Sequence, residues 1–220
     1  LLLCLLNTIA VLTVNVRALG PKKSLVGLST INSDMHELLG FNPLWQDITN
    51  WLGVAAILTA LGFAALGLMQ LFRRKSIQRV DRDILALGVF YFVVAAVYIL
   101  FEALIINYRP ILVDGALEAS FPSSHTMVVL CTMGTAIIQF HTRIRRKPVR
   151  ITAVSAYSVM IVMTVIGRLI AGVHWLTDIV GGVLLGGALV LMYLGVLTQL
   201  APPKDNVEPM LLDQSQPDQG

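Results

Sequence analysis

The stretch from Gly167 to Asp178 places an arginine, a histidine and an aspartate between two long apolar runs. Charged groups are costly beside a bilayer, so their presence there indicates a function. If a helix opens at Trp175 or Thr177, the side chains of His174 and Asp178 lie one turn apart on the same face. The carboxylate can then hydrogen-bond one imidazole nitrogen, which fixes the tautomer and leaves the other nitrogen free to react.

A second polar stretch, Pro122-Ser123-Ser124-His125, stands at the start of another apolar run. The free backbone N–H groups at the beginning of such a helix form an anion site. Ordinary helix capping by Ser123 and Ser124 is an equally good interpretation, because a cap and an oxyanion ligand use the same geometry. His125 is an ionisable group at the membrane interface, where such groups are usually functional.

Two arginines, Arg109 and Arg168, complete the set of polar residues that could act together. Their planar guanidinium groups suit the oxygens of a phosphoryl group, although anchoring of lipid headgroups is the simpler alternative. A metal site built from His125, His174 and Asp178 is disfavoured, because two arginines repel a divalent cation and no further carboxylates cluster there. We therefore expect no metal and no other cofactor.

The elements that must position these residues are transmembrane helices. Of the 220 residues, 56% are hydrophobic and 13% are charged, and the mean hydropathy is +0.76. These values lie outside the range of soluble domains and predict an all-α, polytopic helical bundle in a membrane. A β-barrel would show alternation instead. The two cysteines lie in apolar runs, which excludes a disulfide framework.

About six membrane spans are expected, each near the length that crosses the hydrocarbon core. The first is expected to be truncated, and a retained signal peptide is the alternative. The intervening loop, residues 18–50, carries a short amphipathic helix over 33–39, and we expect His36 within it to be a solvated loop histidine. Gly182 and Gly186 give the last span a face for close helix packing. The predicted spans are residues 1–16, 52–72, 84–106, 121–140, 151–166 and 179–200.

The distribution of basic residues predicts the topology. Ten of the sixteen Lys and Arg lie in the loops 73–83 and 141–150, and the positive-inside rule places both loops and the C-terminus in the cytoplasm. Arg109 and His174 then share the opposite, extracytoplasmic face of the plasma membrane. Because the bases flank apolar runs, nucleic-acid binding is not expected. We predict one transmembrane domain over residues 1–200 and a disordered cytoplasmic tail over 201–220.

Three short segments resemble the signatures of the type 2 phosphatidic acid phosphatase (PAP2) superfamily, written KxxxxxxRP, PSGH and SRxxxxxHxxxD. The spacing of the third signature is kept in full. The resemblance implies a metal-independent membrane phosphatase that hydrolyses a phosphate or pyrophosphate monoester of a lipid, either phosphatidate or polyprenyl pyrophosphate in type. The matching segments are Tyr108-Arg109-Pro110, Pro122-Ser123-Ser124-His125, and Gly167-Arg168 with His174 and Asp178.

The resemblance also implies a role for each residue. His174 would be the nucleophile that forms a phosphohistidine, with Asp178 orienting it, and His125 would protonate the leaving oxygen. A lipid phosphate in the membrane would be the substrate. The phosphate would be held by Arg109, Arg168, Ser123 and Ser124 together with nearby backbone amides.

This chain departs from the signatures at three positions. Glu102 stands where the family has lysine, seven residues before Arg109, while Ser124 replaces a glycine and Gly167 a serine. Seven residues are about two helical turns, so Glu102 is expected near the same face as Arg109. An anion there affects phosphate affinity and substrate selectivity. A phosphotransferase that uses the same histidine, and a non-catalytic relative that binds or transports lipid phosphates, are the alternatives.

Overall fold

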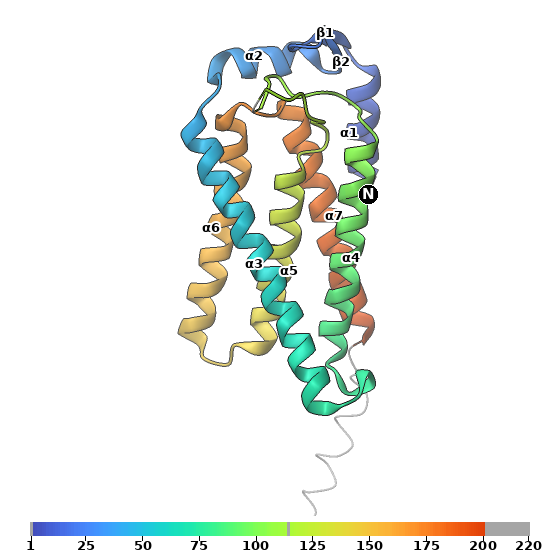
Figure 1. The fold of residues 1–220 in the computed structure, drawn as a ribbon, viewed down its shortest axis with the longest axis vertical. Helices are drawn as coiled ribbons and strands as arrows, with labels where there is room; N and C mark the ends of the chain where they lie inside the picture. The colour runs from blue at the N-terminus through green and yellow to red at the C-terminus, as the bar shows by residue number, and fades with distance from the viewer. Residues whose placement is uncertain (1, 114, 201–220) are drawn as a thin grey trace, which may run out of the picture.

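Five long helices run side by side and form the body of the molecule (Figure 1). The computed structural model describes residues 2–113 and 115–200, and the predicted tail over 201–220 lies outside them. The predicted all-α membrane bundle is confirmed. The five helices are α3 (Pro43–Arg74), α4 (Arg82–Ala103), α5 (Ser124–Arg143), α6 (Lys147–Ala171) and α7 (Leu176–Leu200).

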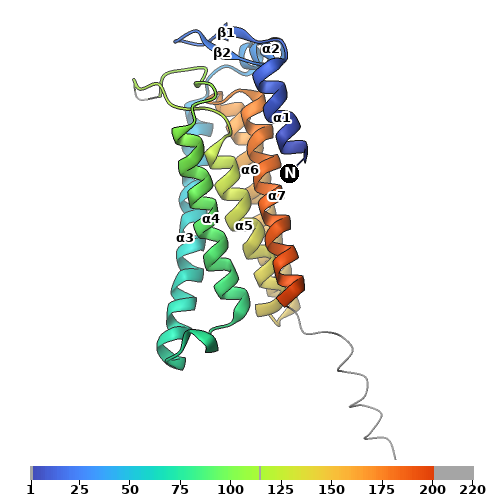
Figure 2. The same cartoon turned by 90° about the vertical axis from the view of Figure 1, so that its right-hand side faces the viewer.

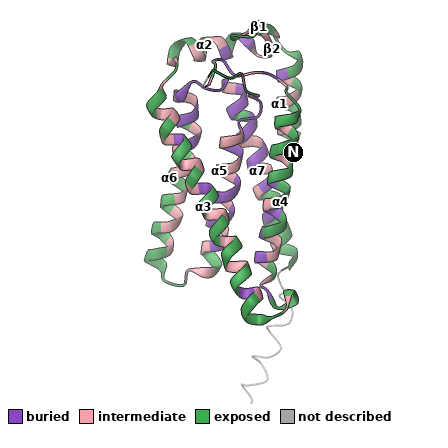
Figure 3. Cartoon of the chain, viewed as in Figure 1, coloured by how far each residue is buried: buried purple, intermediate pink, exposed green. Residues whose placement is uncertain are grey.

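Four of these helices, α3, α4, α6 and α7, are long and apolar enough to cross a membrane. The fifth, α5, is more polar and packs against all four of the others. Buried residues gather on α5, on α7 and in the loop that precedes α5 (Figure 3). The buried polar groups of α5 have protein partners: Gln139 Nε2 donates to Tyr193 Oη at 2.7 Å, and Thr135 Oγ1 lies 3.2 Å from Tyr91 Oη.

A layer of short elements covers one end of the bundle, which we call the capped end (Figures 1 and 2). It consists of an antiparallel hairpin, β1 (Arg17–Leu19) and β2 (Ser24–Val26), and of α2 (Ser29–Leu39). The apolar helix α1 (Leu2–Thr13) leads into this layer beside α7. The sequence predicted a helix beginning at residue 33 and no strands, since three-residue strands are too short to show alternation.

Asparagine side chains attach this layer to the bundle. Asn32 on α2 is fully buried, and its amide donates to Thr177 Oγ1 at 2.9 Å and accepts from Thr177 N at 3.2 Å. Asn42 caps α3, because its Oδ1 accepts from Trp45 N at 3.2 Å. These bonds satisfy N–H groups that the first turns of α7 and α3 leave free.

The opposite end of the bundle, which we call the basic end, is held by ion pairs. Arg143 on α5 lies 3.2 Å from Asp81 and 2.6 Å from Asp83, and Arg74 on α3 lies 2.8 Å from Asp81. The hydrogen bond from Arg74 lowers the pKa of Asp81 below its ordinary value. The two basic loops are thus fixed to each other and to the start of α4.

The glycine face predicted on the last span is confirmed, and it packs against α5. A Cβ atom at Gly182 would lie 2.7 Å from the carbonyl oxygen of Ser123, and one at Gly186 would lie 3.1 Å from Leu130. Such distances leave no room for a side chain at Gly182. The close approach brings the beginning of α7 against the beginning of α5 at the capped end.

Candidate active site

The three motif segments meet at the capped end, between the loop that joins α4 to α5 and the short link that joins α6 to α7. Two hydrogen bonds connect them: Ser123 N donates to the carbonyl oxygen of Asp178 at 2.9 Å, and Trp175 Nε1 donates to the carbonyl oxygen of Tyr108 at 2.8 Å. The structure therefore brings the predicted residues together, although up to 70 residues separate them in the sequence.

The imidazole of His174 is buried in the α6–α7 link, and its orientation is defined by Ser120. Its Nδ1 lies 3.1 Å from the carbonyl oxygen of Ser120 and 3.1 Å from Ser120 Oγ. A carbonyl oxygen only accepts, so Nδ1 carries the hydrogen and Nε2 carries a free lone pair. Among the described residues nothing hydrogen-bonds Nε2, which is buried. This nitrogen is therefore available as a nucleophile or ligand.

The charge state of His174 follows from its surroundings. Burial lowers the pKa of His174 well below 6.5, and the positive charges of Arg168 and Arg109 lower it further. The imidazole is therefore neutral at physiological pH, which is the protonation state that a nucleophilic nitrogen requires.

Asp178 does not contact His174 in the way the sequence predicted. Asp178 Oδ2 lies 4.0 Å from His174 Nδ1, too far for a hydrogen bond. The helix α7 begins at Leu176, between the two predicted starting points, yet the direct hydrogen bond does not form. The Ser120 hydroxyl lies between the two and donates to Asp178 Oδ2, while Asn107 Nδ2 donates to Oδ1 at 3.1 Å. Ser120 and Asn107 are thus site residues that no motif pointed to.

Both arginines are buried beside this histidine. Arg168, in the last turn of α6, is 1% exposed, and its Nη1 donates to Thr49 and Asn50 of α3 at 3.3 Å each. No described residue pairs with its Nε. Arg109 is 8% exposed and forms an ion pair with the half-exposed Glu118 at 2.9 Å. Burial lowers the pKa of Arg109, and Glu118 opposes that shift. Two buried guanidiniums with spare donors have the chemistry to bind an anion.

The first turn of α5 supplies the remaining predicted residues. Ser123 is the N-cap residue but makes no capping bond with its side chain; its Oγ accepts from Thr126 Oγ1 at 3.0 Å. His125 faces α3, because a Cβ atom at Gly53 would lie 3.1 Å from its Cδ2. Within residues 2–113 and 115–200, no group of three or more His, Cys, Asp or Glu is arranged to hold a metal ion.

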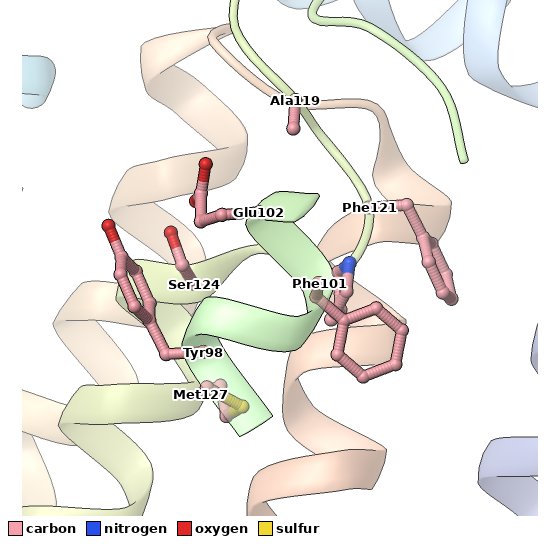
Figure 4. A pocket seen from close by; sticks show the side chains of 8 residues that line it. Tyr98, Phe101, Glu102, Ala119, Phe121, Ser124 and Met127 are labelled. Atoms are coloured by element: carbon pink, nitrogen blue, oxygen red, sulfur yellow. The ribbon is translucent and has the colours of Figure 1, made fainter. Parts of the chain in front are cut away.

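Glu102 lies at the end of α4 beside a small pocket with a volume of about 10 Å³ (Figure 4). The oxygen atoms of Tyr98, Glu102 and Ser124 lie on the same side of this pocket in Figure 4. The predicted two-turn spacing from Glu102 to Arg109 does not apply, because α4 ends at Ala103 and a loop follows. Two of the three departures from the family signatures, at positions 102 and 124, therefore line one pocket.

His36 is not the solvated histidine that the sequence predicted. It is half-buried on α2, and its ring meets that of Trp175 edge-on, with the centroids 5.6 Å apart. Burial lowers the pKa of His36. The contact places α2 directly over the residue that follows His174.

The structure is that of a polytopic membrane protein in which two buried arginines lie beside a histidine whose Nε2 has no hydrogen-bond partner among the described residues. Residues 103–200 match the model of the PAP2 superfamily, and this match confirms the resemblance carried by the three motifs. No curated protein matches the chain.

The fold is similar to that of a solved structure, a transmembrane PAP2 type phosphatidylglycerolphosphate phosphatase from Bacillus subtilis. The TM-score is 0.67 and the sequence identity is 19%, and the match covers 91% of this chain and 94% of that chain. Because the match covers 91% of this chain, the common fold extends beyond residues 103–200.

Proposed function

We propose that this protein is a membrane lipid phosphatase that uses His174 as its nucleophile and needs no metal. The observation that carries the proposal is the buried Nε2 of His174, which has no hydrogen-bond partner among the described residues and lies beside two buried arginines. The family match over residues 103–200 supports a phosphatase. The similarity in fold to a phosphatidylglycerolphosphate phosphatase supports a lipid phosphate as the substrate.

The first chemical step is attack by His174 Nε2 on phosphorus. The new P–N bond forms as the P–O bond to the lipid alcohol breaks, and His125 donates a proton to the leaving oxygen. Arg109 and Arg168 hold the oxygens on which charge develops. The carboxylate of Glu118 pairs with Arg109 but is half-exposed, and ion pairs of exposed groups are weak. A doubly charged phosphate can therefore replace this carboxylate as the partner of Arg109.

The second step returns the enzyme to its starting state. His125, now without its proton, takes one from a water molecule, and the resulting hydroxide attacks phosphorus. The P–N bond breaks, inorganic phosphate leaves, and His174 is neutral again. If a lipid or sugar alcohol takes the place of water, the same site acts as a phosphotransferase.

The substrate class is a phosphate or pyrophosphate monoester of a lipid, phosphatidate or polyprenyl pyrophosphate in type. The reacting group must lie at the capped end, while the lipid chains extend along the apolar helices. Glu102 and Ser124 line a small pocket next to Ala119 and Phe121, and we infer that they influence which headgroup the protein accepts. The site faces the extracytoplasmic side of the cell membrane if the basic end is cytoplasmic.

The central test is His174→Ala, measured by phosphate release from a panel of phospholipids and polyprenyl phosphates. We expect this variant to lose all measurable activity, whereas chelators leave the parent protein active. His141→Ala is the matched control, because His141 is exposed at the basic end of α5. After rapid quench, labelled phosphate should be found on His174. A fully active His174→Ala protein would refute the proposal, and phosphate transfer to an added alcohol would identify the phosphotransferase.

A further inference from the structure

We propose that Ser120 is a positioning residue that connects Asp178 to the nucleophilic histidine through its hydroxyl group. The inference rests on the proposed function, since it assigns the residue that couples the carboxylate to His174. Its basis is the separation of 4.0 Å between Asp178 Oδ2 and His174 Nδ1, with Ser120 Oγ hydrogen-bonded to both groups.

The direction of each hydrogen bond is fixed by the chemistry of the groups. A carboxylate only accepts, so the single hydroxyl proton of Ser120 is donated to Asp178 Oδ2. The Ser120 oxygen can then only accept from His174, as does the Ser120 carbonyl oxygen, each 3.1 Å from Nδ1. Both contacts require the hydrogen on Nδ1. Ser120 alone therefore selects the tautomer in which Nε2 can attack.

Ser120 is itself held firmly in place. It is 1% exposed, and its backbone N–H donates to the carbonyl oxygen of Asn107 at 3.0 Å. The side chain of the same Asn107, which is 2% exposed, donates to the other oxygen of Asp178 at 3.1 Å. Asn107 thus fixes the serine and the carboxylate relative to each other. Residues whose own positions are locked by such bonds can hold a reacting group within the tolerance that catalysis needs.

The bridge acts during the chemical step. When Nε2 bonds to phosphorus, the imidazole ring acquires a positive charge that it shares with the Nδ1–H group. Ser120 then accepts a stronger hydrogen bond from Nδ1 and in turn polarises toward Asp178. This stabilisation appears only as the P–N bond forms, so its loss should lower kcat and leave KM unchanged.

The first experiment compares Ser120→Ala with Ser120→Thr in the full chain. We expect Ser120→Ala to lower kcat and the rate of phosphohistidine formation by about 10- to 100-fold, the range seen when such supporting partners are removed. KM should stay unchanged, and Ser120→Thr, which keeps the hydroxyl, should restore most of the activity. Wild-type kcat in a correctly folded Ser120→Ala protein would overturn the proposal.

A double-mutant cycle with Asp178→Asn separates a bridge from two independent roles. If Asp178 acts through Ser120, the change Asp178→Asn should cost much less activity in the Ser120→Ala background than in the parent. If the two losses multiply, the carboxylate acts on His174 directly and the proposal is wrong.

A spectroscopic measurement keeps the proposal testable whether or not the protein is the proposed phosphatase. The proton on His174 Nδ1 should have a downfield resonance that moves upfield in Ser120→Ala, because one of its two acceptors is removed. Ser120→Cys, a close match in size, serves if the alanine variant does not fold. An unchanged resonance refutes the bridge, whereas loss of the proposed function alone would leave the shift intact.

Discussion

At the scale of single residues, the site depends on a histidine that stays neutral among cations. Burial is the larger cause, and Arg168 and Arg109 add to it. A histidine whose pKa is lowered keeps its neutral form at every pH above that lowered value. The nucleophilic form of His174 is therefore fully present at neutral pH and is lost only in acid.

This charge state can be measured directly by NMR on protein with labelled histidines. We expect the resonance that disappears in His174→Gln to belong to a neutral imidazole at pH 6.5 and to begin titrating only at lower pH. The ring nitrogen shifts should identify Nδ1 as the protonated atom. A His174 resonance that titrates at 6.5 or above would contradict the burial and the cationic surroundings seen here.

The sequence predicted the charged members of the site and the serines of the second motif, but not Ser120 and Asn107. Arg109, Arg168 and His174 are conspicuous because ionisable groups are rare beside apolar runs. Ser120 and Asn107 carry no such signal, because serine and asparagine are common in any loop. Their roles arise from the path of the loop between α4 and α5, where an isolated bridge pairs Tyr108 with Ala119.

At the scale of helices, apolar runs located the spans but misplaced their ends. The predicted span 84–106 ends at Ala103, and the span predicted from residue 121 begins as a helix at Ser124. An apolar sequence indicates burial or contact with lipid, and a buried loop can be as apolar as a helix. The loop between these two helix ends contains much of the site, so the boundaries were wrong next to the site residues.

The contact between α5 and α7 gives a prediction about one helix face. We expect Gly182→Val to disrupt the site and lower thermal stability markedly, because its new side chain would meet the Ser123 carbonyl oxygen and Thr126. Gly187→Val is the matched control on the same helix, since a Cβ atom there would meet no described residue within 4 Å. Activity and melting temperature of both variants test this. Equal behaviour of the two would show that close packing at Gly182 is not required.

At the scale of the whole molecule, the sequence predicted a helical bundle but not which helix lies at its centre. The central helix α5 is not among the four most apolar long helices. A helix surrounded by protein can keep polar groups if its neighbours satisfy them, as Tyr91 and Tyr193 do here. The outer helices face lipid and must be apolar. Hydropathy thus ranks the helices by their contact with lipid, and only the structure shows which helix lies at the centre of the bundle.

The two ends of the bundle also differ in charge, and this difference predicts its orientation. The basic end carries ten of the sixteen Lys and Arg, in the loops 73–83 and 141–150, whereas the site lies at the capped end. The ion pairs of Arg74 and Arg143 with Asp81 neutralise only part of that charge. The remaining bases favour the cytoplasmic side.

Labelling single cysteines on intact cells measures this orientation. In a background without Cys4 and Cys131, we expect Leu25→Cys on the exposed hairpin to react with a membrane-impermeant maleimide from outside. Arg145→Cys in the exposed basic loop should react only after permeabilisation. The reverse pattern would place the site in the cytoplasm, where it would act on lipids of the inner leaflet. The orientation therefore decides which pool of lipid phosphates His174 can reach.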